Sequence, residues 1–479
     1  MQGLDQTINN IMQPITEAVQ SFIFYEIAVF GYSFPWIVMW LIIAAIYFTF
    51  YFRFINFRGF GHTFRLLRGD YDKPDSIGEI SHFQALTTAL SGTVGIGNIG
   101  GVAIVITLGG PGAFFWMVVA GIFGMATKFI ECILGVMYRQ ENADGSVSGG
   151  PMYYLEYGLK AKGYTKLAKP LGIFYAVSMV IGCMGIGNMF QSNQAFEQFV
   201  FVTGGAESYF ADKGWLFGSV MMVSIGIVII GGIKSIAKVT SRMVPFMAGF
   251  YILFGLIIIA MNYAKIPWAI SAVATNAFAP EAIGGGMIGV MMLGFKRAVF
   301  SNEAGIGSAA IAHAAVQTDE PVTEGYVALL GPFIDTVVIC SITAMIILTT
   351  VYDPSLVGTG AKIQGVQLTS RAFAENLSWS VIPLSVIAIL FAFSTIISWS
   401  YYGLKGWSYL FGESSFTKNI FRVIFCLFVA LGCMIQLDAV LDFSDALVFI
   451  VAIPNILGLY ILAPVVKVAV TDYQRRRGL

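Results

Sequence analysis

The chain has 479 residues, of which 57% are hydrophobic and only 11% are charged. A soluble domain carries roughly 25% charged residues, so this composition places the chain in a lipid bilayer. Lysine and arginine together number 27, and so do aspartate and glutamate, so no net charge points to a nucleic acid. We therefore expect membrane lipid as a partner and no nucleic acid, and we expect no obligate protein partner.

The N-terminal segment, residues 1–80, is expected to combine three parts. Its first 20 residues contain no lysine or arginine, so the basic region of a cleavable signal peptide is missing. Residues 1–22 are instead typical of an amphipathic helix that lies on the membrane surface. A first transmembrane helix follows near 33–52, and then an arginine-rich loop that we expect in the cytoplasm.

Apolar runs long enough to cross about 30 Å of hydrocarbon recur along the chain. Charged or Pro- and Gly-rich turns separate them, and together they predict an all-α polytopic membrane protein with about eleven transmembrane helices. We place these spans near 33–52, 82–108, 112–137, 171–200, 215–233, 243–262, 283–316, 326–350, 380–403, 420–436 and 446–466.

The basic residues are distributed unevenly among the predicted loops. Most of them follow the first, third, fifth and ninth spans or lie in the tail 467–479. Cytoplasmic loops carry an excess of lysine and arginine. We therefore expect the N-terminus outside and the basic tail in the cytoplasm, which an odd number of spans satisfies.

Two predicted spans are interrupted by glycine at equivalent places. The second span contains "SGTVGIGN" at 91–98, and the seventh contains "FSNEAGIG" at 300–307. Each begins a block of five spans, within 81–262 and 283–466, and an outer loop at 263–282 separates the blocks. Because five is odd, the two blocks enter the membrane from opposite sides. This pattern is typical of an inverted repeat with a discontinuous first helix in each half.

A broken helix in lipid needs a partner for its freed main-chain groups. Each unpaired N–H or C=O costs several kcal/mol (about 2–7) unless another group replaces the bond. A carboxylate suits the N-terminus of a half-helix, and freed carbonyls suit Na+ or an ammonium group. A zwitterionic amino acid with a cation would satisfy both. The alternative, in which the glycines only allow close helix packing, is less favoured because the two clusters match in position.

At these residues the chain resembles the alanine or glycine:cation symporter family. The stretches that carry the resemblance are "ALSGTVGIGNIGGVA" (89–103), "SGGPMYYLEYGL" (148–159), "MGIGNMFQSNQ" (184–194) and "FSNEAGIGSAAIAHAA" (300–315). The resemblance implies a LeuT-type 5+5 inverted repeat preceded by one extra helix. It also implies uptake of alanine or glycine by alternating access at the cytoplasmic (inner) membrane, with Na+ as coupling ion and no cofactor.

The resemblance also implies substrate-binding residues in both breaks. Main-chain groups of Thr93, Gly95 and Gly97 would meet the substrate carboxylate, and the side-chain oxygen of Asn98 would lie near substrate or ion. Phe300 and Ser301 would contact the amino group and side chain.

Two further positions on other spans are substrate candidates. Gln191 resembles a substrate ligand of the family, although an interhelical hydrogen bond is the alternative. Trp399 would form a wall that limits side-chain size, or it is ordinary packing.

The ninth span supplies candidate sodium ligands. Na+ prefers hard oxygen ligands, which hydroxyls and freed carbonyls provide. The LeuT-type pattern implies that Ser394 and Thr395 join the carbonyls of Ser91 and Val94. The alternative is that these hydroxyls bond back to their own helix.

Two acidic residues inside the predicted spans are candidates for function because ionised groups at this depth are costly. Glu303 lies in the second break, where it could contribute to gating or coupling. It could equally cap a half-helix or pair with Lys296 or Arg297. Asp335 lies inside the eighth span and needs a partner or a watery cavity.

Other classes of membrane protein fit the sequence less well. No His-Glu-x-x-His or Gly-x-Ser-x-Gly motif points to an enzyme. A channel is disfavoured because the two glycine clusters differ in sequence. The nearest alternative is a LeuT-type transporter of another small solute, driven by H+ or Na+.

Overall fold

The computed structural model describes residues 2–29, 32–71, 73, 75–279, 286–354, 357, 365–434 and 438–479. These residues are mostly helical. Their strands form two short antiparallel hairpins, β1 (Glu26–Val29) with β2 (Tyr32–Pro35) and β3 (Gln140–Glu141) with β4 (Val147–Ser148).

The helices of the first half lead up to and follow the first glycine cluster. They are α1 (Gln2–Ile23), α2 (Trp36–Tyr51), α3 (Ile55–Arg58), α4 (Phe60–Leu67), α5 (His82–Thr93), the π-helical η1 (Gly97–Gly101), α6 (Val102–Met137), α7 (Pro151–Tyr153), η2 (Tyr154–Gly158), α8 (Leu159–Ala161), α9 (Thr165–Met184), η3 (Gly185–Met189), α10 (Phe190–Val202), η4 (Gly205–Glu207), α11 (Gly214–Ile230) and α12 (Gly232–Met261).

The helices of the second half contain the second glycine cluster. They are η5 (Tyr263–Lys265), α13 (Ile266–Ala277), α14 (Gly286–Asn302), α15 (Ser308–His313), α16 (Pro321–Ala328), α17 (Leu330–Pro332), η6 (Phe333–Ile339), α18 (Cys340–Thr349), α19 (Gly365–Asn376), η8 (Ser378–Ser380), α20 (Val381–Phe411), α21 (Ser415–Gly432) and α22 (Asp438–Arg477).

Each of the expected spans overlaps one or more of these helical segments. In the described part of the chain, 7 continuous helices are long and apolar enough to cross a membrane. One of them, Gly97–Met137, contains parts of two expected spans, because the backbone at Gly110 leaves the helical conformation (φ 70°) just before Pro111. The expected spans 33–52 and 215–233 correspond to the shorter apolar helices α2 and α11, and the expected span 283–316 corresponds to the interrupted pair α14 and α15.

The structure moves one boundary and adds helices in the outer loops. The expected basic loop before residue 243 is helical, because α12 begins at Gly232. A glycine pair reverses the chain within one turn, with Gly232 at φ 63°. Helix α13 lies within the expected outer loop 263–282, and α22 continues into the expected tail as far as Arg477.

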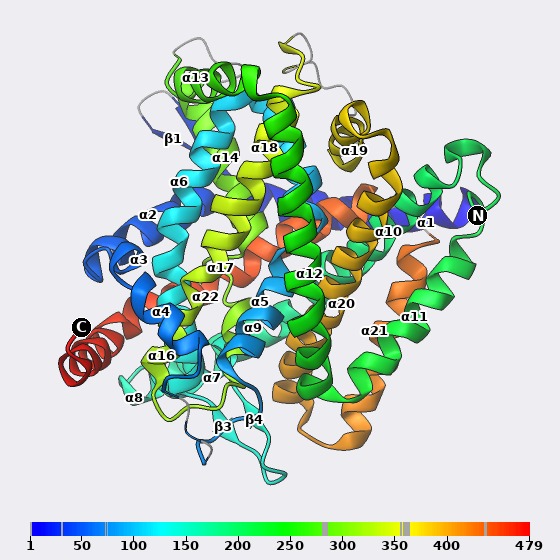
Figure 1. Ribbon diagram of the computed structural model, residues 1–479. Helices are drawn as coiled ribbons and strands as arrows, with labels where there is room; N and C mark the ends of the chain where they lie inside the picture. The colour runs from blue at the N-terminus through cyan, green and yellow to red at the C-terminus, as the bar shows by residue number, and fades with distance from the viewer. Residues whose placement is uncertain are drawn as a thin grey trace.

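The two ends of the bundle carry different elements. Figure 1 shows α13 and α19 at one end, the α19 end, and the hairpin β3–β4 at the opposite end, the β3–β4 end. Helix α12 runs most of the way between them (Figure 1). In the interior, α6 packs against α14 and α16, and α20 packs against α9 and α10, so both interrupted helices are enclosed by the bundle.

Candidate substrate and ion site

The first interruption lies between α5 and η1. Helix α5 begins with a capping box in which Ser81 and Gln84 exchange side-chain and main-chain hydrogen bonds. It ends at Thr93 because Val94 is extended (φ −74°, ψ 96°). The freed N–H of Gly95 donates to Asn98 Oδ1 at 2.9 Å. The break predicted from the glycines therefore exists, and a side chain next to it stabilises it.

Freed carbonyls at the end of α5 face α20. The hydroxyl of Thr395 donates to the Ser91 carbonyl at 3.0 Å. The indole of Trp399 donates to the Gly92 carbonyl at 3.1 Å. Because both donors come from one helix, α20 holds the last turn of α5 in place.

The two hydroxyls expected to bind Na+ point in different directions. Thr395 faces the Ser91 carbonyl, whereas the Ser394 hydroxyl donates to Phe391 of its own helix at 2.9 Å. The Ser394 carbonyl accepts from the Ser91 hydroxyl at 2.5 Å. The structure thus brings Ser91, Ser394 and Thr395 together, and Val94 follows directly after α5.

The second interruption lies between α14 and α15. Three residues have positive φ there: Glu303 at 56°, Gly305 at 94° and Gly307 at 84°. Glycine tolerates this region, but a glutamate held in it costs about 1–3 kcal/mol. Such strain at a polar, buried position is typical of a functional site.

Side chains from distant elements satisfy the main chain of this second break. Glu131 on α6 accepts from the Gly305 N–H at 2.9 Å, and Asn455 on α22 donates to the Gly305 carbonyl at 2.8 Å. Tyr175 on α9 donates to the Ile306 carbonyl at 3.0 Å. These three residues are partners of the break that the sequence does not reveal, because they lie far from it along the chain.

A cavity of about 260 Å³ lies against both breaks. Helices α10 and α20 form further walls, and the first residues of α19 pack on η1 near Gly100. The lining residues are Gly92, Thr93, Gly95, Ile96, Gly97, Gly100, Gly101, Ile104, Ile186, Phe190, Gln191, Gln194, Arg297, Phe300, Ser301, Glu303, Gly365, Val366, Thr395 and Trp399. All the predicted substrate residues except Asn98 are among them.

Two lining positions have features that suit a bound solute. A Cβ added at Gly97 would meet no atom within 4 Å, so this main chain is open to the cavity. The Gln191 amide nitrogen donates to the Ile186 carbonyl at 3.3 Å within its own span, while its Oε1 is buried without a hydrogen-bond partner. A buried acceptor of this kind is available to a ligand donor.

Asn98 has a different environment from the one expected. Its oxygen is used by Gly95, and its amide nitrogen donates to Asp335 Oδ1 at 2.5 Å and to Ser301 Oγ at 3.1 Å. The Ser301 hydroxyl also donates to Asp335 Oδ2 at 2.5 Å. Asn98 therefore lies behind the cavity wall, and Asp335 has the partners that its burial requires.

Glu303 lines the cavity at the start of the second break. The Ser308 hydroxyl, at the beginning of α15, donates to its carboxylate. This contact joins two side chains, and no side chain among the described residues caps the main-chain N–H groups of α15, so the role of Glu303 in gating or coupling stays a prediction.

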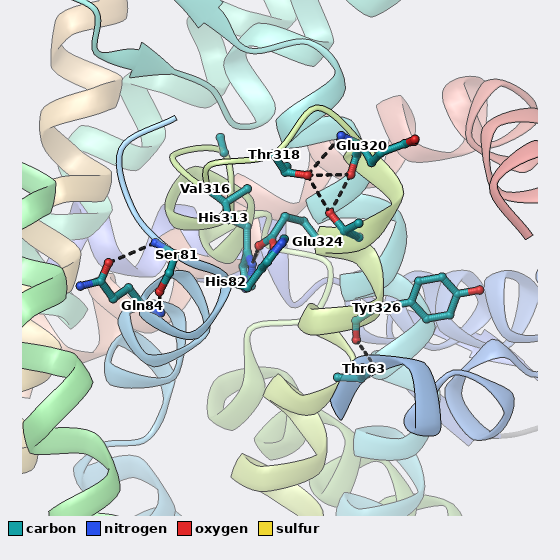
Figure 2. A network of polar contacts seen from close by, with 12 residues as sticks. Thr63, Ser81, His82, Gln84, His313, Val316, Thr318, Glu320, Glu324 and Tyr326 are labelled. Carbon is teal, nitrogen blue, oxygen red and sulfur yellow. Dashed lines mark hydrogen bonds and ion pairs between the residues drawn. The ribbon is translucent and has the colours of Figure 1, made fainter. Parts of the chain in front are cut away.

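A second polar network joins the β3–β4 ends of the interrupted helices (Figure 2). The carboxylate of Glu324, on α16, accepts from His82 at the start of α5 and from His313 at the end of α15. All three side chains are buried. Glu324 therefore connects α5, which precedes the first break, to α15, which follows the second break.

The loops next to this network are joined through their main chains. Ile80 and Val316 form a parallel bridge, and the Arg139 guanidinium donates to the carbonyls of Ala314 and Val316 at 2.9 and 2.6 Å. It also donates to Ile77 at 2.8 Å. These contacts link the start of α5 to the end of α15.

Two helices interrupted at matched places around one central cavity define a class of protein. The fold is a LeuT-type 5+5 inverted repeat preceded by one extra helix, which is the architecture of a secondary transporter. The profile of the sodium:alanine symporter family matches residues 16–478, and the chain belongs to this family. It is a membrane transporter and not an enzyme.

Individual relatives agree with this assignment. The chain is 40% identical to the sodium/alanine symporter AgcS of Methanococcus maripaludis, over 90% of this chain and 92% of that protein. It is 32% identical to the probable sodium/glutamine symporter GlnT of Bacillus subtilis, over 92% and 88%. The crystal structure of MhsT in complex with L-phenylalanine has the same fold, with a TM-score of 0.57, 17% identity and coverage of 81% of this chain and 89% of that one.

Proposed function

We propose that this transporter takes up alanine or glycine together with Na+. The observation that carries the proposal is the cavity against both breaks, where the open main chain of Gly97 and the unpartnered oxygen of Gln191 face the same space. The carboxylate of a small zwitterionic amino acid can accept from the main chain near Gly97, and its ammonium group can donate to the Gln191 oxygen.

The substrate carboxylate lies at the first break. The N-terminal end of the continuous helix formed by η1 and α6 carries a positive partial charge, and Gly95 and Gly97 let a ligand approach its main chain. The ammonium group donates to Gln191 Oε1. Thr93, Phe300 and Ser301 complete the walls, and Trp399, which donates to the Gly92 carbonyl, forms the wall on the α20 side.

The sodium ion lies between α5 and α20. The carbonyls of Ser91 and Val94 and the hydroxyls of Ser394 and Thr395 are its proposed ligands, for which the Ser394 hydroxyl must turn away from Phe391. The contact of Thr395 with the Ser91 carbonyl supports this placement. Because these carbonyls belong to the helix that binds the substrate, binding of the ion and of the substrate are coupled.

Transport proceeds by alternating access in the cytoplasmic (inner) membrane. The repeats 81–262 and 283–466 move against each other, and the cavity opens first at the α19 end, which faces outside, and then at the β3–β4 end. The N-terminus lies outside and the C-terminus in the cytoplasm. The basic residues of the predicted loops support this orientation.

Uptake of labelled alanine into proteoliposomes tests the proposal. An imposed inward Na+ gradient should drive accumulation that unlabelled glycine inhibits, whereas a proton gradient of equal size should not. Accumulation driven only by protons, or uptake of another solute but not of alanine, would favour the alternative. The name of the relative GlnT makes glutamine the first other solute to test.

A further inference from the structure

The central cavity contains a cationic side chain that the proposed substrate and ion positions do not use. Arg297 lies on α14, three residues before Phe300, and lines the cavity. Its guanidinium carbon lies 5.7 Å from the centre of the Phe300 ring. Because α14 begins near the α19 end and ends at the second break, Arg297 lies on the α19 side of that break.

The charge of Arg297 is not balanced by a protein group in the described part of the chain. Its Nε is buried without a hydrogen-bond partner. The ion pairs of the described residues involve other basic side chains, and Glu303, the acid that shares the cavity, accepts from Ser308. A guanidinium has a planar fork of donors that matches a carboxylate, and a buried donor without a partner is costly.

The cavity also reaches beyond the breaks along α14. Its lining includes Arg297, one helical turn before Phe300. With a rise of about 1.5 Å per residue, Arg297 lies about 4.5 Å beyond Phe300 along the helix. A methyl group does not cover this distance, but a side chain of glutamate length does.

We propose that Arg297 is a carboxylate-binding position at the α19 end of the central cavity. It binds the side-chain carboxylate of an amino acid longer than alanine whose main-chain groups occupy the breaks, and so extends the range of ligands to acidic amino acids. This inference rests on the proposed function, because it places the ligand's α-carbon at the same breaks. The carboxylate could also be the α-carboxylate of an arriving amino acid, and the experiment separates the two sources.

The test compares glutamate with norvaline as inhibitors of labelled alanine uptake in proteoliposomes. The two side chains have similar length, and only glutamate ends in a carboxylate. The variants are Arg297→Gln and, as a matched control, Lys296→Gln. Lys296 is the neighbouring cation, lies over the Phe24 ring at 4.1 Å and does not line the cavity.

In the wild type, glutamate should inhibit at a lower concentration than norvaline. Arg297→Gln should raise the half-inhibitory concentration of glutamate roughly tenfold, as expected for the loss of a hydrogen bond to a charged group, and that of norvaline less than about twofold. Lys296→Gln should change neither. If Arg297→Gln instead raises the KM of alanine and both inhibition constants by one factor, Arg297 binds the α-carboxylate of arriving substrate.

The proposal is overturned if glutamate and norvaline inhibit the wild type equally and Arg297→Gln behaves like Lys296→Gln. If Arg297→Gln does not fold, Arg297→Lys keeps the charge without the planar fork and should weaken glutamate inhibition selectively. A glutamate-induced rise in melting temperature of the purified wild type, absent in the variant, reports the site independently of transport. Failure of alanine uptake in the wild type would then contradict the proposed function alone.

Discussion

At the scale of single residues, the proposed substrate position requires main-chain groups that are open to the cavity. Gly97 shows this most clearly, because space for a side chain exists there but belongs to the cavity. A larger residue should fit without a clash, and it should fill the volume that the substrate needs.

We predict that Gly97→Leu abolishes alanine uptake without preventing folding. Gly61→Leu is the matched control, since a Cβ at this exposed helical glycine also meets no atom within 4 Å and Gly61 lies away from the cavity. Uptake is measured in proteoliposomes, and folding by size-exclusion chromatography and melting temperature. Normal uptake by a folded Gly97→Leu protein would refute the proposed substrate position.

A second residue-scale prediction concerns the ion. The double variant Ser394→Ala, Thr395→Val should raise the Na+ concentration for half-maximal alanine uptake, by about tenfold if one good ligand interaction is lost. Ser400→Ala on the same helix is the control, because its hydroxyl bonds only back to Ile397 at 2.6 Å. An unchanged sodium dependence in the double variant would move the ion elsewhere.

How far the sequence predicts the site depends on where the partners of each residue come from. The breaks were predictable, because glycine clusters are conspicuous in apolar spans and both breaks are present in the structure. Their partners Glu131 and Asn455 were not, since they lie on α6 and α22, far away in the sequence. The contact of Asn98 with Asp335 was not predictable for the same reason, as Asp335 comes from another element, and the role expected for Asn98 near substrate or ion stays a prediction.

At the scale of elements, the contact of α5, α15 and α16 through Glu324 is a second feature to test. Two buried histidines, His82 and His313, depend on one carboxylate, and a buried donor that loses its acceptor costs about 1–3 kcal/mol. The network connects both interrupted helices, so its loss affects the β3–β4 end of the whole bundle.

We predict that Glu324→Gln lowers the free energy of unfolding by about 1–3 kcal/mol, because His82 and His313 contact different carboxylate oxygens and the amide nitrogen replaces one of these two acceptors. Chemical unfolding in detergent followed by tryptophan fluorescence measures it. Glu320→Gln, one turn away, is the control. Its pair with Arg476 is partly exposed, so a much smaller change is expected. Equal losses in both variants would contradict the role given to the network.

Hydrophobic periodicity and charge predict where the helices cross the membrane, but they do not predict every helix boundary. The spans were predictable because bilayer thickness sets their length. The start of α12 was not, because the basic residues near it suggested a loop, whereas the glycine pair Gly231 and Gly232 already provides the turn. Helix α19 was missed because it is amphipathic rather than apolar, and its position is set by packing on η1.

At the scale of the whole molecule, α4 near the β3–β4 end ties the N-terminal segment to α22. The His62 ring contacts the Tyr473 hydroxyl at 2.7 Å. Burial, followed by the charges of Arg65 and Arg477, lowers the pKa of His62 to about 4. The unfolded chain, with a histidine pKa near 6.5, therefore binds a proton at pH values where the folded protein does not.

We predict that stability falls as pH decreases from about 6.5 to about 4, since the unfolded state binds more protons in this window. His62→Gln should remove part of this dependence and leave stability above pH 7 little changed, because glutamine keeps a polar contact for Tyr473. Melting temperatures of both proteins between pH 4 and 8 provide the comparison. Parallel curves for both proteins would show that His62 is not responsible.

The central claim is that an amino acid and Na+ bind where two helices are interrupted inside the membrane. A cryo-electron microscopy map of the protein with alanine and Na+ tests it most directly. We expect density for alanine between Gly97 and Phe300, within reach of Gln191, and an ion between Ser91 and Thr395. Alanine density elsewhere, with both breaks in direct contact and no space between them, would contradict the account.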